Sequence, residues 1–262
     1  MRNRIPILIP LAVVAIVLCV DVAAQQQQDT KPQDAIQQNE KIKVLNQMLL
    51  QAAAARQAGD YPKAVSIMLE ATQQDPSQDV LWASLGQSYL GAKQYPEAIA
   101  ALKKGVALKP ERQEYHNLLG TAYLRLRQMD DAVGEFKTAA ELNDKNPTDP
   151  KHNDNAAMYW YNVGAVLSIQ GKSAEAVAAF DKAIAADPKK AEAYYQKGIN
   201  LIAKASIDKD GKMSAPEGTE EAFQKYLELS PNGQFADQVK QMLAMIGAKV
   251  ETQYGTAGKG KK

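Results

Sequence analysis

The sequence predicts an all-α protein, a right-handed α-solenoid of stacked helix-turn-helix pairs with a C-terminal capping helix. The first observation is composition, since 42 of the 262 residues are alanine, which has the highest helix propensity and fits where helices approach closely. The second is spacing, because small residues and prolines recur every 34 residues along much of the chain. With 45% hydrophobic and 23% charged residues, the chain has enough apolar material for a folded core.

The first 24 residues have the organisation of a secretory signal peptide. Two arginines precede an uncharged, mostly apolar run over residues 5–20, and small residues lead to a cleavage position after Ala24. We therefore expect an exported protein, periplasmic or extracellular. One alternative is an uncleaved membrane anchor, although the run is shorter than the ~20 residues that span a bilayer. Another is a lipoprotein acylated at Cys19, where the preceding Leu18 is large for such a site.

Export changes the chemistry that the mature chain can perform. The single cysteine, Cys19, lies inside the signal, so the mature chain has no thiol for a disulfide, a nucleophile or a metal ligand. The formal charge of +1 comes from 31 Lys and Arg against 30 Asp and Glu, and removal of Arg2, Arg4 and Asp21 brings it to zero. Such a balance gives no broad basic surface, so we expect no nucleic-acid partner.

Residues 25–44 are predicted to be a glutamine-rich linker followed by the start of a helix. The segment contains a run of four glutamines and Pro32, which is typical of a flexible connection. Asp34 fits the cap of a helix whose apolar residues carry it into the folded part as far as Ala58.

Small residues at fixed spacing divide residues 45–247 into repeats. The period is 34 residues until the distance from Gly120 to Gly164 becomes 44, which indicates a ten-residue insert at 147–156. Nine further residues, around 206–216, lie inside the last repeat. The frame gives repeats at 45–78, 79–112, 113–146, 157–190 and 191–233, and an amphipathic cap at 234–247. The markers are Ala64, Ala98, Ala132 and Ala176, then Ala52, Gly86, Gly120, Gly164 and Gly198, and Pro76, Pro110, Pro188 and Pro231.

The second repeat carries the most specific motif. Residues 82–89 read WASLGQSY, which is W-x2-L-G-x2-Y, and Ala98 and Pro110 follow at fixed distances. This pattern resembles the tetratricopeptide repeat, and the fourth repeat matches it nearly as well. The resemblance spans about three quarters of the chain. It implies antiparallel helices A and B in each repeat, stacked so that helices A lie on the concave side.

The first insert, 147–156, is polar, contains two prolines, and is expected to be a surface loop. Its polar side chains include Asp149, His152, Asn153 and Asp154, but they match no ligand spacing that indicates a metal site. We therefore expect no bound metal.

The second insert and the C-terminus are also expected to be peripheral. Asp210-Gly211 between short arms favours a β-hairpin, while a calcium loop would need its glycine and glutamate at other positions. Thr219 stands where the family has alanine, so the fifth pair departs from the family pattern at this packing position. Residues 248–262 form a Lys/Gly-rich tail that we expect to be flexible.

No catalytic or cofactor motif is found in the sequence. His116 occupies the position that repeats 2 and 4 give to tryptophan, so a packing role is favoured over a general base, and His152 lies in the polar insert. Phosphate-loop, dinucleotide, serine-hydrolase and zinc-hydrolase motifs do not occur. We expect no enzyme activity and no cofactor, although a carboxylate-only site is not ruled out by sequence.

The resemblance implies that helices A present binding residues on the concave face. The second, fifth, ninth, twelfth and thirteenth repeat positions point there. Lysine and asparagine at the fifth and ninth positions would indicate the chaperone-binding subfamily, but the first repeat has Leu49 and Ala53. Amides can hydrogen-bond a peptide backbone, and tyrosine and arginine are frequent interface anchors. The predicted partner-binding residues are Gln87, Asn117, Thr121, Arg125, Tyr161 and Tyr195.

These observations predict an exported, non-enzymatic scaffold or adaptor of the cell envelope or secreted space that binds a protein or peptide. The alternative is an accessory factor in the assembly or export of envelope polysaccharide or peptidoglycan. A membrane link is expected only through an uncleaved signal segment. The identity of the partner and the oligomeric state stay open at this point.

Overall fold

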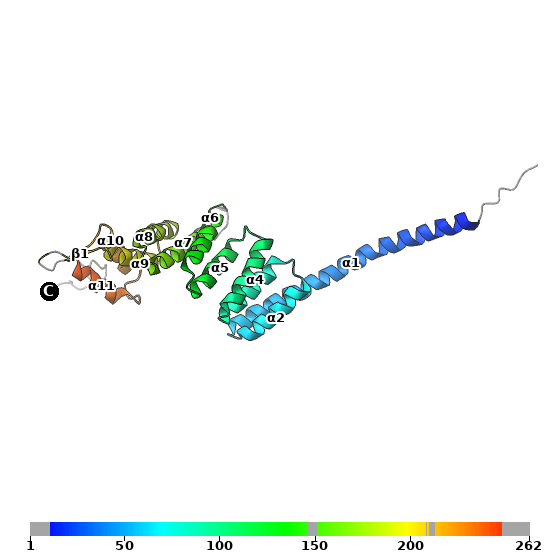
Figure 1. Cartoon of the computed structure of the whole chain (residues 1–262), viewed down its shortest axis with the longest axis horizontal. Helices are drawn as coiled ribbons and strands as arrows, with labels where there is room; N and C mark the ends of the chain where they lie inside the picture. Colours follow the sequence, from blue (N-terminus) through cyan, green and yellow to red (C-terminus); the bar gives the residue numbers. More distant parts are fainter. Residues whose placement is uncertain (1–10, 146–150, 208, 210–212, 248–262) are drawn as a thin grey trace, which may run out of the picture.

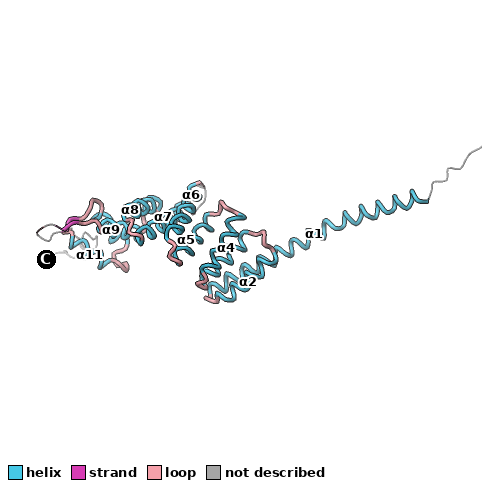
Figure 2. Tube along the Cα trace, in the orientation of Figure 1, coloured by secondary structure: helices cyan, strands magenta, loops and turns pink. Residues whose placement is uncertain are grey.

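The computed structural model describes residues 11–145, 151–207, 209 and 213–247, and of residues 11–33 it describes the backbone. Over these residues the protein is an elongated stack of helices, with helix α1 projecting from one end (Figure 1). Most of the described chain is helical, and the short strands lie near the opposite end (Figure 2). None of the helices in this part combines the length and the apolar character that crossing a bilayer requires.

The described residues form five helix pairs and a terminal helix, which agrees with the predicted α-solenoid. The first helices of the pairs, helices A, are α1 (Leu11–Gln57), α3 (Asp79–Gly91), α5 (Gln113–Arg125), α7 (His152–Ile169) and α9 (Ala191–Ile202). Helices B are α2 (Tyr61–Gln74), α4 (Tyr95–Leu108), α6 (Met129–Asp144), α8 (Ser173–Ala186) and α10 (Thr219–Leu229). Strands β1 (Ser206–Ile207) and β2 (Met213–Ser214) precede α10, and α11 (Ala236–Met245) ends the stack.

Helix α1 corrects the prediction for residues 25–44. The helix begins at Leu11 and runs for 47 residues, so a linker and a cap at Asp34 are both wrong. Glutamine, lysine and alanine have good helix propensities and outnumber Pro32, which removes one backbone donor within the helix. At 1.5 Å per residue α1 is about 70 Å long. Among its described side chains, burial begins only at Leu45, so the preceding part of the helix projects from the stack (Figure 1).

A glycine on helix A allows helix B of the same pair to lie close. A Cβ added to Gly164 would lie 2.7 Å from Cε1 of Phe180, and one added to Gly120 would lie 2.7 Å from Cδ1 of Phe136. Both rings are buried, at 0% and 1% exposure. The predicted close approach at the glycine positions is therefore confirmed, and the large residue of helix B fills the space that the missing side chain leaves. The other two pairs of this kind are Gly86 with Leu102 and Gly198 with Phe223.

The turn between helices A and B has one residue in the left-handed region in each of the first four pairs. These residues are Gly59, Lys93, Arg127 and Gly171, with φ of 76°, 60°, 59° and 74°. Their spacing follows the repeat frame. Glycine adopts this conformation without a steric penalty, whereas a Cβ at Lys93 or Arg127 makes it unfavourable.

The first insert is partly helical, which corrects the predicted loop at 147–156. Helix α7 begins at His152, and Ala156 within it is buried. Asn143, buried near the end of α6, donates from Nδ2 to the carbonyl oxygen of His152 at 3.0 Å. This contact holds the start of α7 against α6, and the polar local sequence does not reveal it. Residues 147–150, including Asp149, lie outside the described residues.

The second insert forms the predicted β-hairpin. Ser206 pairs with Ser214 and Ile207 with Met213 in an antiparallel arrangement, while residues 208 and 210–212 lie outside the described part. Thr219 is fully buried at the start of α10, and its Oγ1 donates to the carbonyl oxygen of Pro216 at 2.7 Å. The hydroxyl group is thus satisfied at a position where the family has alanine.

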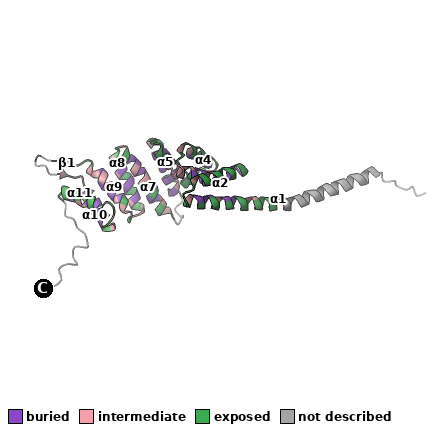
Figure 3. Ribbon diagram, turned by 90° about the horizontal axis from the view of Figure 1, so that it is seen from below, coloured by how far each residue is buried: buried purple, intermediate pink, exposed green. Residues whose placement is uncertain are grey.

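Successive helices A lie closer to one another than successive helices B do, which agrees with the expected concave helix-A side. Helix α1 contacts α3, α3 contacts α5, and α7 contacts α9, while no successive helices B contact one another as extensively in the described residues. Figure 3 shows the buried residues gathered between the stacked helices. At the C-terminal end, Val239 and Leu243 of α11 are fully buried in a cluster with Phe223 and Leu227. Helix α11 thus lies within the cap predicted at 234–247, and the tail at 248–262 is outside the described residues.

Candidate functional site on the helix-A face

Successive helices A form one continuous surface, which we call the helix-A face. It comprises the second, fifth, ninth, twelfth and thirteenth repeat positions of α1, α3, α5, α7 and α9. Helix α1 contacts α3, α3 contacts α5, and α7 contacts α9, while the Asn162–Asn117 hydrogen bond joins α7 to α5. Polar side chains on this face are therefore close enough to act on one ligand.

Gln87 on α3 and Arg125 on α5 are both exposed on this face. Neither side chain makes a hydrogen bond or an ion pair with another described residue. An exposed amide offers both donor and acceptor groups, and a free guanidinium offers donors in a planar fork. These two predicted residues are therefore available to a partner.

Asn117 and Thr121 on α5 are half-buried and already organised by the fold. Asn162 of α7 donates from Nδ2 to Oδ1 of Asn117 at 3.0 Å, and Thr121 Oγ1 donates to the carbonyl oxygen of Asn117 at 3.0 Å. The first bond crosses from the third pair to the fourth. It fixes the orientation of the Asn117 amide, whose Nδ2 has no acceptor among the described residues.

Tyr161 and Tyr195 occupy the same repeat position but differ in accessibility. Tyr161 is half-buried, with its ring 5.7 Å from that of Phe180, and burial raises the pKa of its hydroxyl. Tyr195 is only 7% exposed. Its ring stacks on Phe235 with centroids 4.0 Å apart, and its hydroxyl donates to Gln238 Oε1 at 3.0 Å.

The position of Tyr195 corrects its assignment as a partner-binding residue. Phe235 and Gln238 belong to the segment that forms α11, so the cap occupies the surface that a partner would need. The repeat register predicts the direction of a side chain, but it does not predict that a later helix folds back over it.

Arg56 is a candidate binding residue that the sequence analysis did not include. It lies at the twelfth position of the first repeat, near the end of α1, and its side chain is half-buried. Its Nη1 donates to Ser84 Oγ at 2.9 Å and to Ser88 Oγ at 3.2 Å, both on α3. The repeat register contains a signal for Arg56. The twelfth position is leucine (Leu90) in the second repeat, so an arginine at this position of the first repeat is unusual.

His116 is held in a structural arrangement. Its Nε2 lies 3.1 Å from the carbonyl oxygen of Pro110, which repeats the 2.8 Å bond from Trp82 Nε1 to the carbonyl oxygen of Pro76 one period earlier. Its Nδ1 lies 2.7 Å from Glu135 Oε2. The imidazolium form alone can donate to both oxygens, and the bond to Glu135 raises the pKa of His116.

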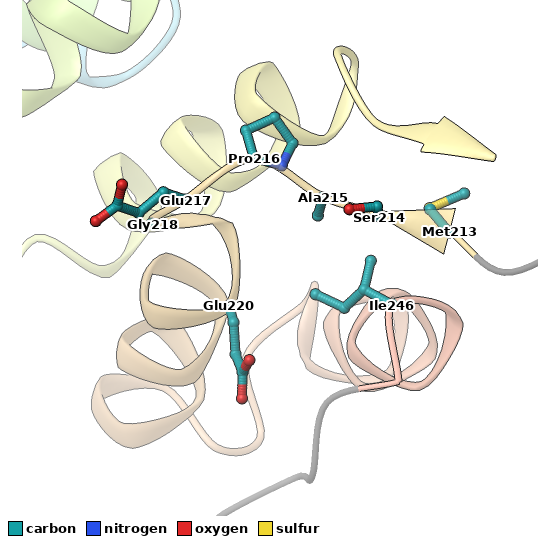
Figure 4. A pocket seen from close by; sticks show the side chains of 8 residues that line it. All are labelled: Met213, Ser214, Ala215, Pro216, Glu217, Gly218, Glu220 and Ile246. Atoms are coloured by element: carbon teal, nitrogen blue, oxygen red, sulfur yellow. The ribbon is translucent and has the colours of Figure 1, made fainter. Parts of the chain in front are cut away.

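The described residues contain no group of three or more His, Cys, Asp or Glu side chains placed to hold a metal ion. A pocket of about 530 Å³ lies away from the helix-A face, between the hairpin, the start of α10 and Ile246. Two carboxylates line it, but Glu217 and Glu220 point away from each other (Figure 4). This arrangement does not form the close carboxylate pair that acid-base catalysis commonly uses.

The architecture defines an α-solenoid of helix pairs with a period of 34 residues. The family description "Tetratricopeptide repeat" matches residues 55–122 and 157–190, so these two segments agree with the repeat that the sequence motifs resemble. A comparison with curated proteins gave no sequence match.

Solved structures share this fold at low sequence identity. YrrB, described as a TPR protein with an unusual peptide-binding site, is 22% identical over 74% of this chain and 90% of that chain, with a TM-score of 0.56. MamA from Desulfovibrio magneticus RS-1 is 18% identical over 74% and 97%, with a TM-score of 0.57. PilW, described as a widely conserved type IV pilus biogenesis factor, is 20% identical over 78% and 88%, with a TM-score of 0.60. At these identities the similarity concerns the fold.

Proposed function

We propose that this protein is a non-enzymatic scaffold that binds an extended segment of a partner protein along the helix-A face. The observation that carries the proposal is the row of polar groups there that lack partners within the described residues. Gln87, Arg125 and the Nδ2 group of Asn117 belong to this row. An extended peptide has unpaired backbone donors and acceptors, so amide side chains at successive helices are suited to bind it.

Two further observations support this proposal. The Asn117–Asn162 bond holds one amide in place before a partner arrives, which reduces the entropy lost on binding. The description of YrrB, which shares the fold, includes a peptide-binding site. For the non-enzymatic part of the proposal, both ring nitrogens of His116 contact oxygens of Glu135 and Pro110, in line with the structural role that the sequence favoured over a general base.

The test is selection of a phage-displayed library of random dodecapeptides on the purified protein, followed by titration with the selected peptides. We expect the alanine variants of Gln87 and Asn117 each to weaken binding by about 1 kcal/mol, the net value of a hydrogen bond. Glu141→Ala, on the exposed side of helix B α6, is the matched control and should bind as the wild type. Failure to select any peptide, or equal loss in the control, would count against the helix-A face.

We further propose that the protein acts outside the cytoplasm, in the cell envelope or the secreted space. The charged, apolar and small-residue parts of the first 24 residues support this location. Mass spectrometry of the protein from its native source should find Gln25 at the N-terminus. An N-terminus at Met1 would refute cleavage and favour the anchored alternative.

A further inference from the structure

We infer that Arg56 binds a carboxylate of the partner, supplied by an aspartate or glutamate side chain within the bound segment. This inference rests on the proposed peptide-binding function and adds the chemistry of the ligand to it. It follows from the surroundings of the Arg56 guanidinium, which is half-buried and has no counter-ion among the described residues.

The charge of Arg56 has no counter-ion in the described residues. No Asp or Glu oxygen of that part lies within 4.0 Å of the guanidinium. Burial lowers the pKa of Arg56, as expected for a cation removed from water without compensation. Two other cations among the described residues have carboxylate partners: Lys197 Nζ lies 2.7 Å from Asp181, and His116 Nδ1 lies 2.7 Å from Glu135.

The contacts that Arg56 does make leave most of its donors available. All three recorded hydrogen bonds come from Nη1, and they reach the neutral oxygens of Ser84 and Ser88. Nε and Nη2 have no acceptor among the described residues. Ser88 Oγ donates in turn to the carbonyl oxygen of Ser84 at 2.8 Å, so this hydroxyl is oriented to accept from the arginine. The two serines therefore hold Nη1 of Arg56 in place. The other edge of the guanidinium, formed by Nε and Nη2, stays available to a carboxylate.

The placement of Arg56 favours a side chain within the bound segment over a chain terminus. The helix-A face continues on α1 from Arg56 to Ala53 and Leu49, and on α3 it continues to Gln87. A bound segment therefore has surface on both sides of the guanidinium. Arg125, two A helices further along the face, is a second cation, and Glu114 and Glu192 at second repeat positions are exposed anions. The preference for a carboxylate therefore rests on the unpaired guanidinium of Arg56 and not on the charge of the whole face.

The test uses the dodecapeptide library described above, displayed so that every peptide is fused at its C-terminal end and has no free terminal carboxylate. We expect peptides selected on the wild type to be enriched in Asp and Glu. Peptides selected on Arg56→Gln should lose this enrichment. The control is Lys63→Gln on α2, which removes the same charge from an exposed position outside the helix-A face and should retain the enrichment.

A double-mutant cycle then tests the pairing itself. In a selected peptide, exchange of the acidic residue for its amide should weaken binding to the wild type by about tenfold or more. The same exchange should have little effect on binding to Arg56→Gln. Arg56→Lys should keep part of the preference for the acidic peptide, because it keeps the charge but loses the fork. Denaturant midpoints of the variants establish that each is folded.

The outcomes separate this inference from the proposed function. If no peptide is selected on the wild type, the proposed function fails and the inference fails with it. If peptides are selected without acidic enrichment, or if Arg56→Gln and the wild type respond equally to the acid-to-amide exchange, Arg56 is not a carboxylate site. The peptide-binding function would then remain supported. Acidic enrichment that appears only when the displayed peptides have free C-termini would also overturn the inference, because the carboxylate would then be terminal.

Discussion

Two glycine-to-alanine substitutions, one in a tight contact and one in open space, test how the helix pairs are packed. In Gly164→Ala the new methyl group would lie 2.7, 2.9 and 2.9 Å from three ring atoms of Phe180. In Gly134→Ala, on helix B α6, nothing lies within 4 Å of the new atom. Both glycines are inside helices, so the gain in helix propensity is common to the two variants.

The expected free energies follow from these distances. Replacing glycine by alanine in a helix interior stabilises by about 1 kcal/mol, so Gly134→Ala should raise the free energy of unfolding by that amount. At Gly164 the buried ring has to move by several tenths of an ångström in a close-packed core, and overpacking of this kind costs about 1–3 kcal/mol. The two variants should therefore differ by about 1–3 kcal/mol, with Gly164→Ala the less stable. Leucine at position 164 should destabilise more.

The assay is guanidinium unfolding of both variants and the wild type, followed by circular dichroism. Thermal unfolding provides a second measurement, since 1 kcal/mol shifts Tm by about 2–4 °C for a protein of this size. Hydrogen exchange of the α7 and α8 amides should locate the loss in the fourth pair, because a solenoid does not always unfold as one unit. If Gly164→Ala is stabilised as much as Gly134→Ala, the close contact with Phe180 does not limit packing, and the explanation of the glycine period is wrong.

Three further predictions concern single side chains. The free energy of unfolding should fall as pH rises from about 6.5, the ordinary pKa of histidine, through the raised pKa of His116. This fall should be absent in His116→Gln, because the folded state stabilises the imidazolium against Glu135; an unchanged pH profile of the denaturant midpoint would refute it. Glycine at Lys93 or Arg127 should stabilise by about 1 kcal/mol by removing the Cβ from a left-handed turn, and a lower Tm would contradict this. Thr219→Val should destabilise by about 1 kcal/mol in chemical unfolding because the carbonyl that its hydroxyl reaches loses a donor, whereas equal stability would mean that the bond contributes little.

The repeat frame predicts which side chains point toward the helix-A face, but it does not predict which of them are exposed to solvent. Gln87 and Arg125 are exposed as the register requires, because the direction of a side chain on a helix depends only on its position along the sequence. Tyr195 also occupies a repeat position of the helix-A face, but Phe235 and Gln238 cover its side chain. The approach of α11 depends on the hydrophobic cluster at the end of the stack, which is a contact between distant segments.

The sequence by itself determined the period, the close approach of each helix pair and the hairpin in the second insert. These features depend on local properties: side-chain size at a fixed helical spacing, and turn residues between short strands. Only the tertiary structure decided that α7 begins at His152 and that the charge of Arg56 has no counter-ion in the described residues. Those features depend on which groups meet across separate helices, and a pattern along one chain does not contain these distances.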